Sequence, residues 1–144
     1  MINLNNYIIE AWSGVKRQTN NAEIEAWCEE MEIENYTINS KGEIDVKGNV
    51  NLGKMNFKEL PYKFGTVTGS FDVSSNKNLT SLKNCPYYVG DSFGCRNCSQ
   101  IDSLEGCPKE VKGDFVLAGS GLKYQFTEKE IRSLCKVKKG VILN

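Results

Sequence analysis

A repeat of 22 residues in the middle of the chain constrains the fold more than any other feature of the sequence. The segment VTGSFDVSSNKNLTSLKNCPYY is followed directly by VGDSFGCRNCSQIDSLEGCPKE, and about ten positions agree between the two. The matched pairs include Val67/Val89, Phe71/Phe93, Ser81/Ser103, Leu82/Leu104, Cys85/Cys107 and Pro86/Pro108. A fixed period of this size is typical of proteins in which each repeat forms one coil of a stack.

Imperfect copies of the repeat flank the two clear ones. The first, VKGNVNLGKMNFKELPYKFGT from Val46, is one residue shorter in its loop, and the last, VKGDFVLAGSGL, breaks off at Leu122. Each copy contains two apolar residues separated by one other residue, as in Phe71-x-Val73. This alternation predicts a short strand with two inward side chains. The glycine-containing segments before these strands, such as 65–69, are expected to form turns. Since one copy cannot bury its apolar face alone, the sequence predicts about four stacked copies with equivalent residues about 4.8 Å apart.

The residues before the repeats predict a helical cap followed by a hairpin. Residues 4–15 carry an unbroken apolar stripe with the spacing of a helix. Residues 21–31 carry a second stripe on an otherwise acidic segment, and its members are Ile24, Trp27, Cys28 and Met31. Across residues 36–46 the apolar period changes to two, which indicates a β-hairpin or two short strands. Residues 1–35 are therefore expected to cover the first edge of the stack.

The residues after the repeats predict a second cap. Thr127 and Glu130 have the spacing of a capping box, with apolar residues behind them, so we expect a helix from Glu128 to about Lys136. Lysines and a glycine follow at 138–140, where the helix dipole favours cations and glycine ends a helix. Residues 141–143 could form a last strand. The predicted architecture is one α+β domain, 1–144, with a helical N-terminal cap (1–35), a β-solenoid of repeats (36–122) and a C-terminal cap (123–144).

The layout within each copy resembles that of leucine-rich repeats. In L-x-L-x-x-N/C-x-L a polar residue turns inward and ties together backbone groups, and Asn76, Cys98 and Ser120 hold that position here. The form V-x-G-D-F…N-x-L-T-S-L-x-x-C-P-x-x-V-G is similar to small leucine-rich-repeat-like proteins of tailed bacteriophages and gut bacteria. The likeness covers about residues 44–122 and extends to the flanking helices and the FTEKEIRSLC segment. It implies a leucine-rich-repeat-like solenoid and a habit of binding proteins, and it carries no catalytic residues.

The composition argues against several classes of function. Eighteen basic and eighteen acidic residues cancel, so no overall charge favours nucleic acid or a membrane surface. The chain has no histidine, which removes the commonest general base and metal ligand and disfavours an enzyme. No run of about 18 apolar residues would span a membrane, and Met1–Tyr7 lacks the layout of a secretory signal. We therefore expect a non-enzymatic cytoplasmic protein without a cofactor, located in the host cytoplasm if a phage encodes it.

Six cysteines leave two interpretations open. The segment 95–98 is a C-x-x-C motif, and with Cys85 and Cys107 it offers four thiolates for a tetrahedral zinc site. The repeat register explains the same residues as packing, because Cys85 and Cys107 occupy one turn position and Cys95 an inward strand position. Cys98 takes the place of the inward asparagine. Cysteine is a small buried hydrophobe in such places, so the sequence favours packing, with zinc as a weak alternative.

The strand alternation also defines a candidate binding surface. If the aromatic strand positions point inward, the residues between them point outward on one face of the sheet, where solenoids commonly bind partners. The residues proposed for this surface are Asn49, Asn51, Ser70, Asp72, Ser92, Arg96 and Asp114. Their small side chains and mixed charges suit a protein surface better than a phosphate backbone.

Two kinds of partner are considered. The first is a host protein, such as a defence component, that a phage accessory protein would bind and modulate. The alternative is nucleic acid, bound by the basic C-terminal segment through Lys136, Lys138 and Lys139. Binding that falls steeply with salt would indicate nucleic acid. No membrane partner is expected.

Overall fold

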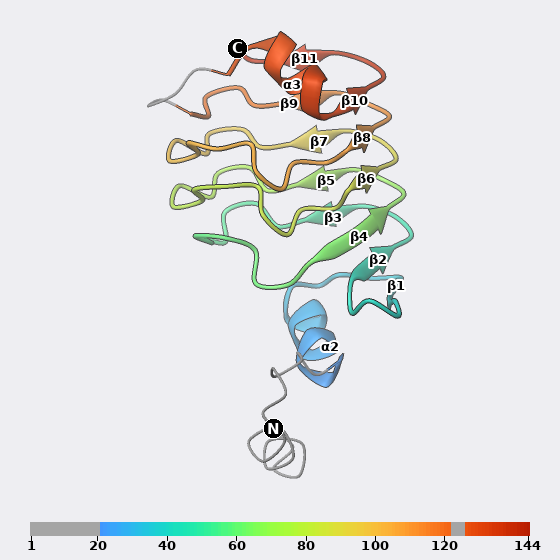
Figure 1. Ribbon diagram of the computed structural model, residues 1–144. Coiled ribbons are helices and arrows are strands. Elements are labelled where there is room, and N and C mark those ends of the chain that lie inside the picture. The colour runs from blue at the N-terminus through green and yellow to red at the C-terminus, as the bar shows by residue number, and fades with distance from the viewer. Residues whose placement is uncertain (1–20, 122–125) are drawn as a thin grey trace, which may run out of the picture.

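The computed structural model describes residues 21–121 and 126–144 of the 144-residue chain. The described chain forms about four stacked coils of roughly 22 residues, with one helix on the N-terminal side and one near the C-terminus (Figure 1). The predicted β-solenoid is therefore confirmed. The helix expected at 4–15 lies outside the described residues.

The coils contribute strands to two sheets, one sheet more than the sequence pattern indicates. Sheet A contains, in spatial order, β1 (Tyr36–Ile38), β2 (Ile44–Val46), β4 (Phe64–Val67), β6 (Tyr88–Val89), β8 (Glu110–Val111) and β10 (Lys136–Val137). Sheet B contains β3 (Val50–Asn51), β5 (Phe71–Asp72), β7 (Phe93–Gly94), β9 (Phe115–Val116) and β11 (Val141–Ile142). The helices are α2 (Asn21–Glu30) and α3 (Glu128–Leu134).

The pairing of the strands reproduces the repeat register. In sheet B, Phe71 lies opposite Phe93, and in sheet A, Val67 lies opposite Val89. The shortened first copy also stacks in register, since Val46 pairs with Val67. All pairs are parallel except β1 with β2, which form the expected antiparallel hairpin. Residues that are equivalent in successive repeats of the sequence therefore lie opposite each other in adjacent coils.

The glycine-containing segments expected to be turns belong partly to sheet A. Val67 and Val89 are fully buried and point into the core, so the valine of each segment completes a strand of its own. The chain turns only after that valine, at the corner between the two sheets. A side chain at Gly90 would collide there with the carbonyl of Thr68 in the preceding coil. The segment 65–69 is thus the end of β4 followed by a corner.

A column of aromatic side chains fills the space between the sheets. Phe64, Phe71, Phe93 and Phe115 are fully buried, and the centroids of successive rings lie 5.0, 6.1 and 5.0 Å apart. Trp27 from α2 extends the column, with 6.0 Å between its ring and that of Phe64. Aromatic pairs at such distances stabilise a core beyond the area that they bury. The phenylalanine column therefore links the coils to the N-terminal helix.

An inward polar position follows the strands of sheet B. The amide of Asn76 donates to the backbone carbonyls of Leu52 (2.9 Å) and Val73 (2.8 Å). Its oxygen accepts a backbone N–H from the first coil at 3.0 Å. Cys98 and Ser120 occupy this position in the next two coils and also donate to backbone carbonyls. The inward position expected from the sequence is therefore a column of side chains that satisfy buried backbone groups.

Helix α2 covers the N-terminal end of the stack. Ile24 and Cys28 are buried, and the half-buried Trp27 packs against the rings of Phe57 and Tyr62. These contacts confirm the apolar stripe predicted for residues 21–31. The glutamates of α2 other than Glu23 are exposed, as expected for a helix with one face on the core.

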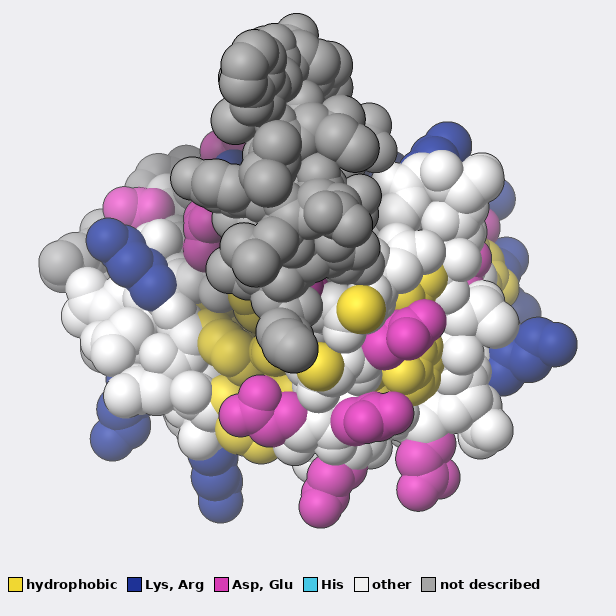
Figure 2. All heavy atoms as spheres, turned by 90° about the horizontal axis from the view of Figure 1, so that it is seen from below, with side chains coloured by type: hydrophobic (Ala, Val, Ile, Leu, Met, Phe, Trp, Pro, Cys, Tyr) yellow, Lys and Arg dark blue, Asp and Glu magenta, His cyan; other side chains and the backbone are white. Residues whose placement is uncertain are grey.

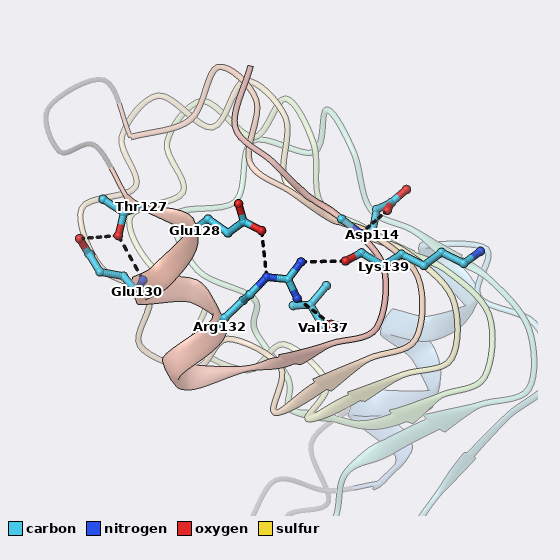
Figure 3. Close-up of polar contacts among 8 residues, drawn as sticks. Asp114, Thr127, Glu128, Glu130, Arg132, Val137 and Lys139 are labelled. Carbon is cyan, nitrogen blue, oxygen red and sulfur yellow. Dashed lines mark hydrogen bonds and ion pairs between the residues drawn. The ribbon is translucent and has the colours of Figure 1, made fainter.

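Helix α3 begins with the predicted capping box. Thr127 Oγ1 accepts the backbone N–H of Glu130 at 3.1 Å, which confirms the box (Figure 3). Cys135, which the prediction places inside the helix, is already extended. Lys136 therefore belongs to β10, and the lysines at 138–139 lie at the corner before β11 and not at the end of a helix.

Arg132 fastens α3 to this corner. Its guanidinium donates to the backbone carbonyls of Val137 (2.9 Å) and Lys139 (2.8 Å), and its Nε donates to Glu128 (2.9 Å; Figure 3). The helix thereby holds β10 and β11, which continue both sheets by one further pair of strands. The last strand predicted at 141–143 is confirmed as β11.

Candidate binding surfaces

The residues proposed from the strand alternation lie along the outer side of sheet B. Asn51 stands opposite Asp72 in the strand register. Phe71 precedes Asp72 and is fully buried, whereas Asp72 is partly exposed. The strand alternation therefore directs Asp72 outward while Phe71 points into the core. The hydrogen bonds of the proposed residues indicate their role.

Four of these residues form a hydrogen-bond ladder from coil to coil. Asn49 Oδ1 accepts the backbone N–H of Ser70 (2.8 Å), and Ser70 Oγ accepts that of Ser92 (3.3 Å). Ser92 Oγ accepts the N–H of Asp114 (3.1 Å), and Asp114 Oδ1 accepts that of Gly140 (2.8 Å; Figure 3). These N–H groups lie at the corners between the sheets, and an unpaired backbone donor there would cost free energy. We call this set the corner ladder, and its side chains serve the fold.

The other three proposed residues differ from one another. Asn51 Oδ1 accepts the backbone N–H of Gly53 (3.0 Å), and Asp72 Oδ1 accepts that of Ser74 (2.8 Å). Arg96 is exposed, and within residues 21–121 and 126–144 no partner of its guanidinium is found. The outer side of sheet B therefore uses most of its polar side chains internally.

The outer face of sheet A presents a different set of side chains. Thr66, Tyr88, Glu110 and Lys136 lie in one row across β4, β6, β8 and β10. Tyr87 directly precedes β6 and is 43% exposed, one of three large apolar side chains so exposed in the described part of the chain. Two adjacent tyrosines therefore stand near the middle of a six-stranded sheet.

Lys63 lies beneath Tyr87. Its Nζ is 5.6 Å from the centroid of the Tyr87 ring, within the range of a cation–π contact. The same ammonium donates to the backbone carbonyls of Phe64 (2.7 Å) and Cys85. Burial lowers the pKa of Lys63, and the nearby charge of Glu43 opposes this shift. Lys63 thus places a cation under the exposed aromatic ring.

Charged side chains continue the row beyond the tyrosines. Glu110 Oε2 lies 3.3 Å from Lys112 Nζ and 3.8 Å from Lys136 Nζ. The Lys136 side chain is 82% exposed. Ion pairs this open to water contribute little to stability, so these groups remain available to a partner.

The strands of sheet A follow an alternating pattern in the sequence, but the glycines beside them make these segments look like turns. Tyr88 is partly exposed and Val89 is buried, the same period of two that identifies the strands of sheet B. A strand of two residues followed by glycine has the composition of a turn, however. The tyrosine pair could therefore have been found only by extending the alternation backwards from Phe93 through the corner.

A depression of about 920 Å³ lies between α2, the turn of the first hairpin and residues 61–63. Two of its three asparagines are already engaged: Asn39 donates to Glu43 and Asp45 (both 3.2 Å), and Asn84 donates to the carbonyl of Leu60 (2.7 Å). Among the asparagines, this leaves the amide of Asn21 to orient a small molecule. The depression therefore gives less support to a ligand site than the open tyrosine face gives to a macromolecular one.

The six cysteines are free thiols and all are buried. The side-chain hydrogen bond between Cys95 and Cys98 raises the pKa of Cys95, to which burial adds, and lowers the pKa of Cys98, which burial opposes. Burial raises the pKa of Cys85 and Cys107. Within the described residues no three Cys, Asp or Glu side chains converge as metal ligands would, so the geometry gives no support to the zinc alternative.

The three lysines proposed for nucleic acid are exposed and occupy β10 and the corner after it. Lys136 shares the outer face of sheet A with Tyr88, because both pair in register with Glu110. Neither α2 nor α3, the helices of the described chain, has the length and apolar character needed to cross a membrane.

Comparison with known proteins finds no matching family model, no matching curated protein and no matching solved structure.

Proposed function

We propose that this protein is a non-enzymatic protein-binding module and that it binds through the outer face of sheet A. The observation that carries the proposal is the pair Tyr87, which is 43% exposed, and Tyr88, which is partly exposed, on a six-stranded sheet beside charged side chains. Tyrosine is frequent in interfaces because its ring buries apolar area while its hydroxyl makes hydrogen bonds. A polar rim around such a centre is the usual anatomy of a non-obligate interface.

The charges around the tyrosines favour an acidic partner. Lysines slightly outnumber acids around β4, β6, β8 and β10; the lysines are Lys63, Lys109, Lys112, Lys136 and Lys138, and the acids are Glu43, Asp45, Asp91 and Glu110. Opposite charges across an interface speed association and select among partners. An acidic segment of a partner protein, placed over Tyr87 and Tyr88, would meet both requirements.

A narrower proposal concerns the type of repeat and the partner. The V-x-G-D-F pattern and the inward column of Asn76, Cys98 and Ser120 support a leucine-rich-repeat-like protein of the kind encoded by tailed phages and gut bacteria. Such a protein would act as an accessory factor that occupies a surface of a host protein, such as a defence component. In this proposal the corner ladder supports the module, while Asn51 and Asp72 form a secondary contact on sheet B.

Single-stranded nucleic acid is the second candidate for the same face. It is favoured by one observation, that Lys136 shares a sheet face with two tyrosines. Bases stack on aromatic side chains while neighbouring lysines neutralise phosphates. The two candidates therefore differ in what covers the tyrosines and not in where binding occurs.

Affinity capture from a bacterial lysate with quantified variants tests the proposed face. The wild type is compared with the double variant Tyr87→Ala/Tyr88→Ala and with Arg96→Ala, which alters sheet B alone. We expect specific protein partners to be lost with the tyrosine variant and retained with Arg96→Ala. Equal capture by all three proteins would remove sheet A as the binding face.

Salt dependence separates the two kinds of partner. Fluorescence anisotropy with a labelled single-stranded oligonucleotide measures binding at increasing salt concentration. Affinity for nucleic acid falls steeply with salt because condensed ions are released from the strand. Absence of oligonucleotide binding, together with tyrosine-dependent capture of a protein, would favour the protein partner.

A further inference from the structure

The strand β3 is the first strand of sheet B, and among residues 21–121 and 126–144 it pairs with β5 alone. Sheet B runs β11-β9-β7-β5-β3, and no described residue pairs with β3 on the side away from β5. The equivalent edge of sheet A is different, because β1 folds back on β2 and covers it. Within the described residues, the N-terminal end therefore has one covered sheet edge and one open one.

The backbone of Asn51 presents hydrogen-bonding groups at this open edge. Val50 N–H donates to the carbonyl of Ser70 (2.8 Å), and Leu52 N–H donates to that of Asp72 (2.7 Å). Successive residues of a strand direct their backbone groups to opposite sides, so the N–H and C=O of Asn51 point away from β5. An edge of this kind is a template for one more strand.

A depression lined by both apolar and polar side chains lies beside the edge. It has a volume of about 320 Å³ and is lined by Met31, Ile33 and Met55 together with residues of β3. The Met55 side chain is 44% exposed. Methionine side chains adapt to partners of varied shape, and they are frequent on surfaces that bind peptides. An added strand could therefore place an apolar side chain in this depression.

Acidic side chains dominate the same end of the molecule. Glu29, Glu30, Glu32 and Glu34 are exposed on or just after α2, and Glu32 also lines the depression. Figure 2 shows Asp and Glu side chains gathered beside hydrophobic ones when the molecule is seen from this end. Lys47 and Lys54 near β3 reduce the negative charge without reversing it. The complementary partner is basic as well as apolar.

We propose that the open edge of β3 binds an extended peptide of alternating basic and apolar residues, which adds a strand to sheet B. The backbone of the peptide pairs with Asn51, one apolar side chain enters the depression between Met31 and Met55, and basic side chains face Glu32 and its neighbours. This site is separate from the tyrosine face of sheet A and does not depend on the proposed function.

A second copy of the protein fits the edge less well than a peptide. The far edge of sheet B, β11, is flanked by Lys138 and Lys139, so its charge would also be complementary. Stacking a whole coil beneath β3 would require the space under the core that α2 fills through Trp27 and Ile24. A single extended segment needs only the edge.

The test uses two fluorescein-labelled peptides and the full-length protein. The peptides are Lys-Val-Lys-Ile-Lys-Val-Lys and the matched acidic Glu-Val-Glu-Ile-Glu-Val-Glu, and anisotropy reports binding. We expect the basic peptide to bind about tenfold or more tightly than the acidic one. Binding should also protect the amide of Asn51 from hydrogen exchange. Equal binding of both peptides, or binding of neither, would overturn the proposal.

Variants locate the site. Asn51→Pro removes the outward N–H at a position where an edge strand tolerates proline, and Met55→Ser removes an apolar side chain that lines the depression. Each substitution should lower the affinity for the basic peptide about tenfold. Leu134→Ser is the control for Met55→Ser, because Leu134 is exposed to a similar degree (46%) at the other end of the molecule.

Two further measurements distinguish binding at β3 from binding at sheet A and from self-association. Tyr87→Ala should leave peptide binding unchanged, and loss of binding in that variant would assign the peptide to sheet A. Sedimentation velocity of the protein alone should show a monomer. Concentration-dependent assembly that Asn51→Pro abolishes would mean that the edge pairs with a second copy, which contradicts the proposal.

Discussion

On the outer side of sheet B, Ser70, Ser92 and Asp114 use their side chains to hold the backbone of the next coil. On sheet A, by contrast, Tyr87 is exposed and Tyr88 is partly exposed, and both lie beside exposed charges. Both faces belong to the same coils and enclose the same phenylalanine column. They differ because the corners that follow sheet A contain backbone N–H groups that side chains of the preceding coil accept. Small polar residues on a repeat surface are therefore not by themselves a binding site.

The largest effect is expected just inside sheet B, at Asn76. Asn76→Ala removes three hydrogen bonds to buried or part-buried backbone groups, so we expect the free energy of unfolding to fall by about 3 kcal/mol. Urea denaturation followed by tryptophan fluorescence measures this, because Trp27 packs on the core. The exposed Asn78 provides the control, and Asn78→Ala should cost less than about 0.5 kcal/mol. Similar costs at the two sites would mean that the inward column does not hold the coils.

A smaller effect is expected on the corner ladder. Asp114→Ala leaves the N–H of Gly140 without its acceptor and should cost about 1 to 2 kcal/mol in the same assay. Asp114→Asn retains an acceptor oxygen and should recover most of the loss. Asp91→Ala, at an exposed position on the neighbouring coil, is the matched control. If Asp91→Ala destabilises the protein as much as Asp114→Ala, the loss of charge and not the loss of the ladder is responsible.

A pH titration separates the shared core from both faces. Burial raises the pKa of Cys28 from its ordinary value of 9.0 to about 11, with the charge of Glu25 adding to the shift. The folded state favours the neutral thiol. The contribution of Cys28 to the free energy of unfolding is therefore complete below pH 9 and is lost as pH rises towards 11. The stability advantage of the wild type over Cys28→Ala should therefore narrow by about 1 kcal/mol between about pH 8 and pH 10. Parallel curves for the two proteins, measured by urea denaturation in a reducing buffer, would contradict this origin.

The smallest effect is expected on sheet A. Glu110→Gln breaks two ion pairs with exposed lysines and should change the free energy of unfolding by about 0.5 kcal/mol or less. The comparison with Asp114→Ala is direct, since each removes one carboxylate from an outer side of the solenoid. A loss at Glu110 as large as that at Asp114 would erase the distinction between the two faces.

The stacking of the coils was predictable because the repeat states it directly. The offsets between Val46, Val67 and Val89 in the sequence are the offsets of the strand register. The capping box at Thr127 was also predictable, since its geometry involves only neighbouring residues. Features that follow from the repeat period or from one local motif can therefore be predicted from the sequence.

Sheet A could not be predicted in the same way, and neither could the hydrogen bonds that side chains form on the outer side of sheet B. A two-residue strand before Gly90 has the composition of a turn, and only its partners in adjacent coils make it a strand. Ser70 and Ser92 have the composition of a solvated surface, yet each accepts a hydrogen bond across a coil boundary. The helix end at Cys135 was misplaced because β10 takes up the following residues.

The corner ladder makes the whole coil a unit by which this chain can be extended. Each acceptor serves the residue that occupies its own place one coil later, so a duplicated segment such as 71–92 would bring its own acceptor and donor. Ser92 would then bind the copy of itself, and the copy would bind Asp114. The loops of a coil can vary in length without breaking the ladder, since its four bonds span 21, 22, 22 and 26 residues. Growth of the solenoid by complete coils therefore follows from four side-chain hydrogen bonds on sheet B.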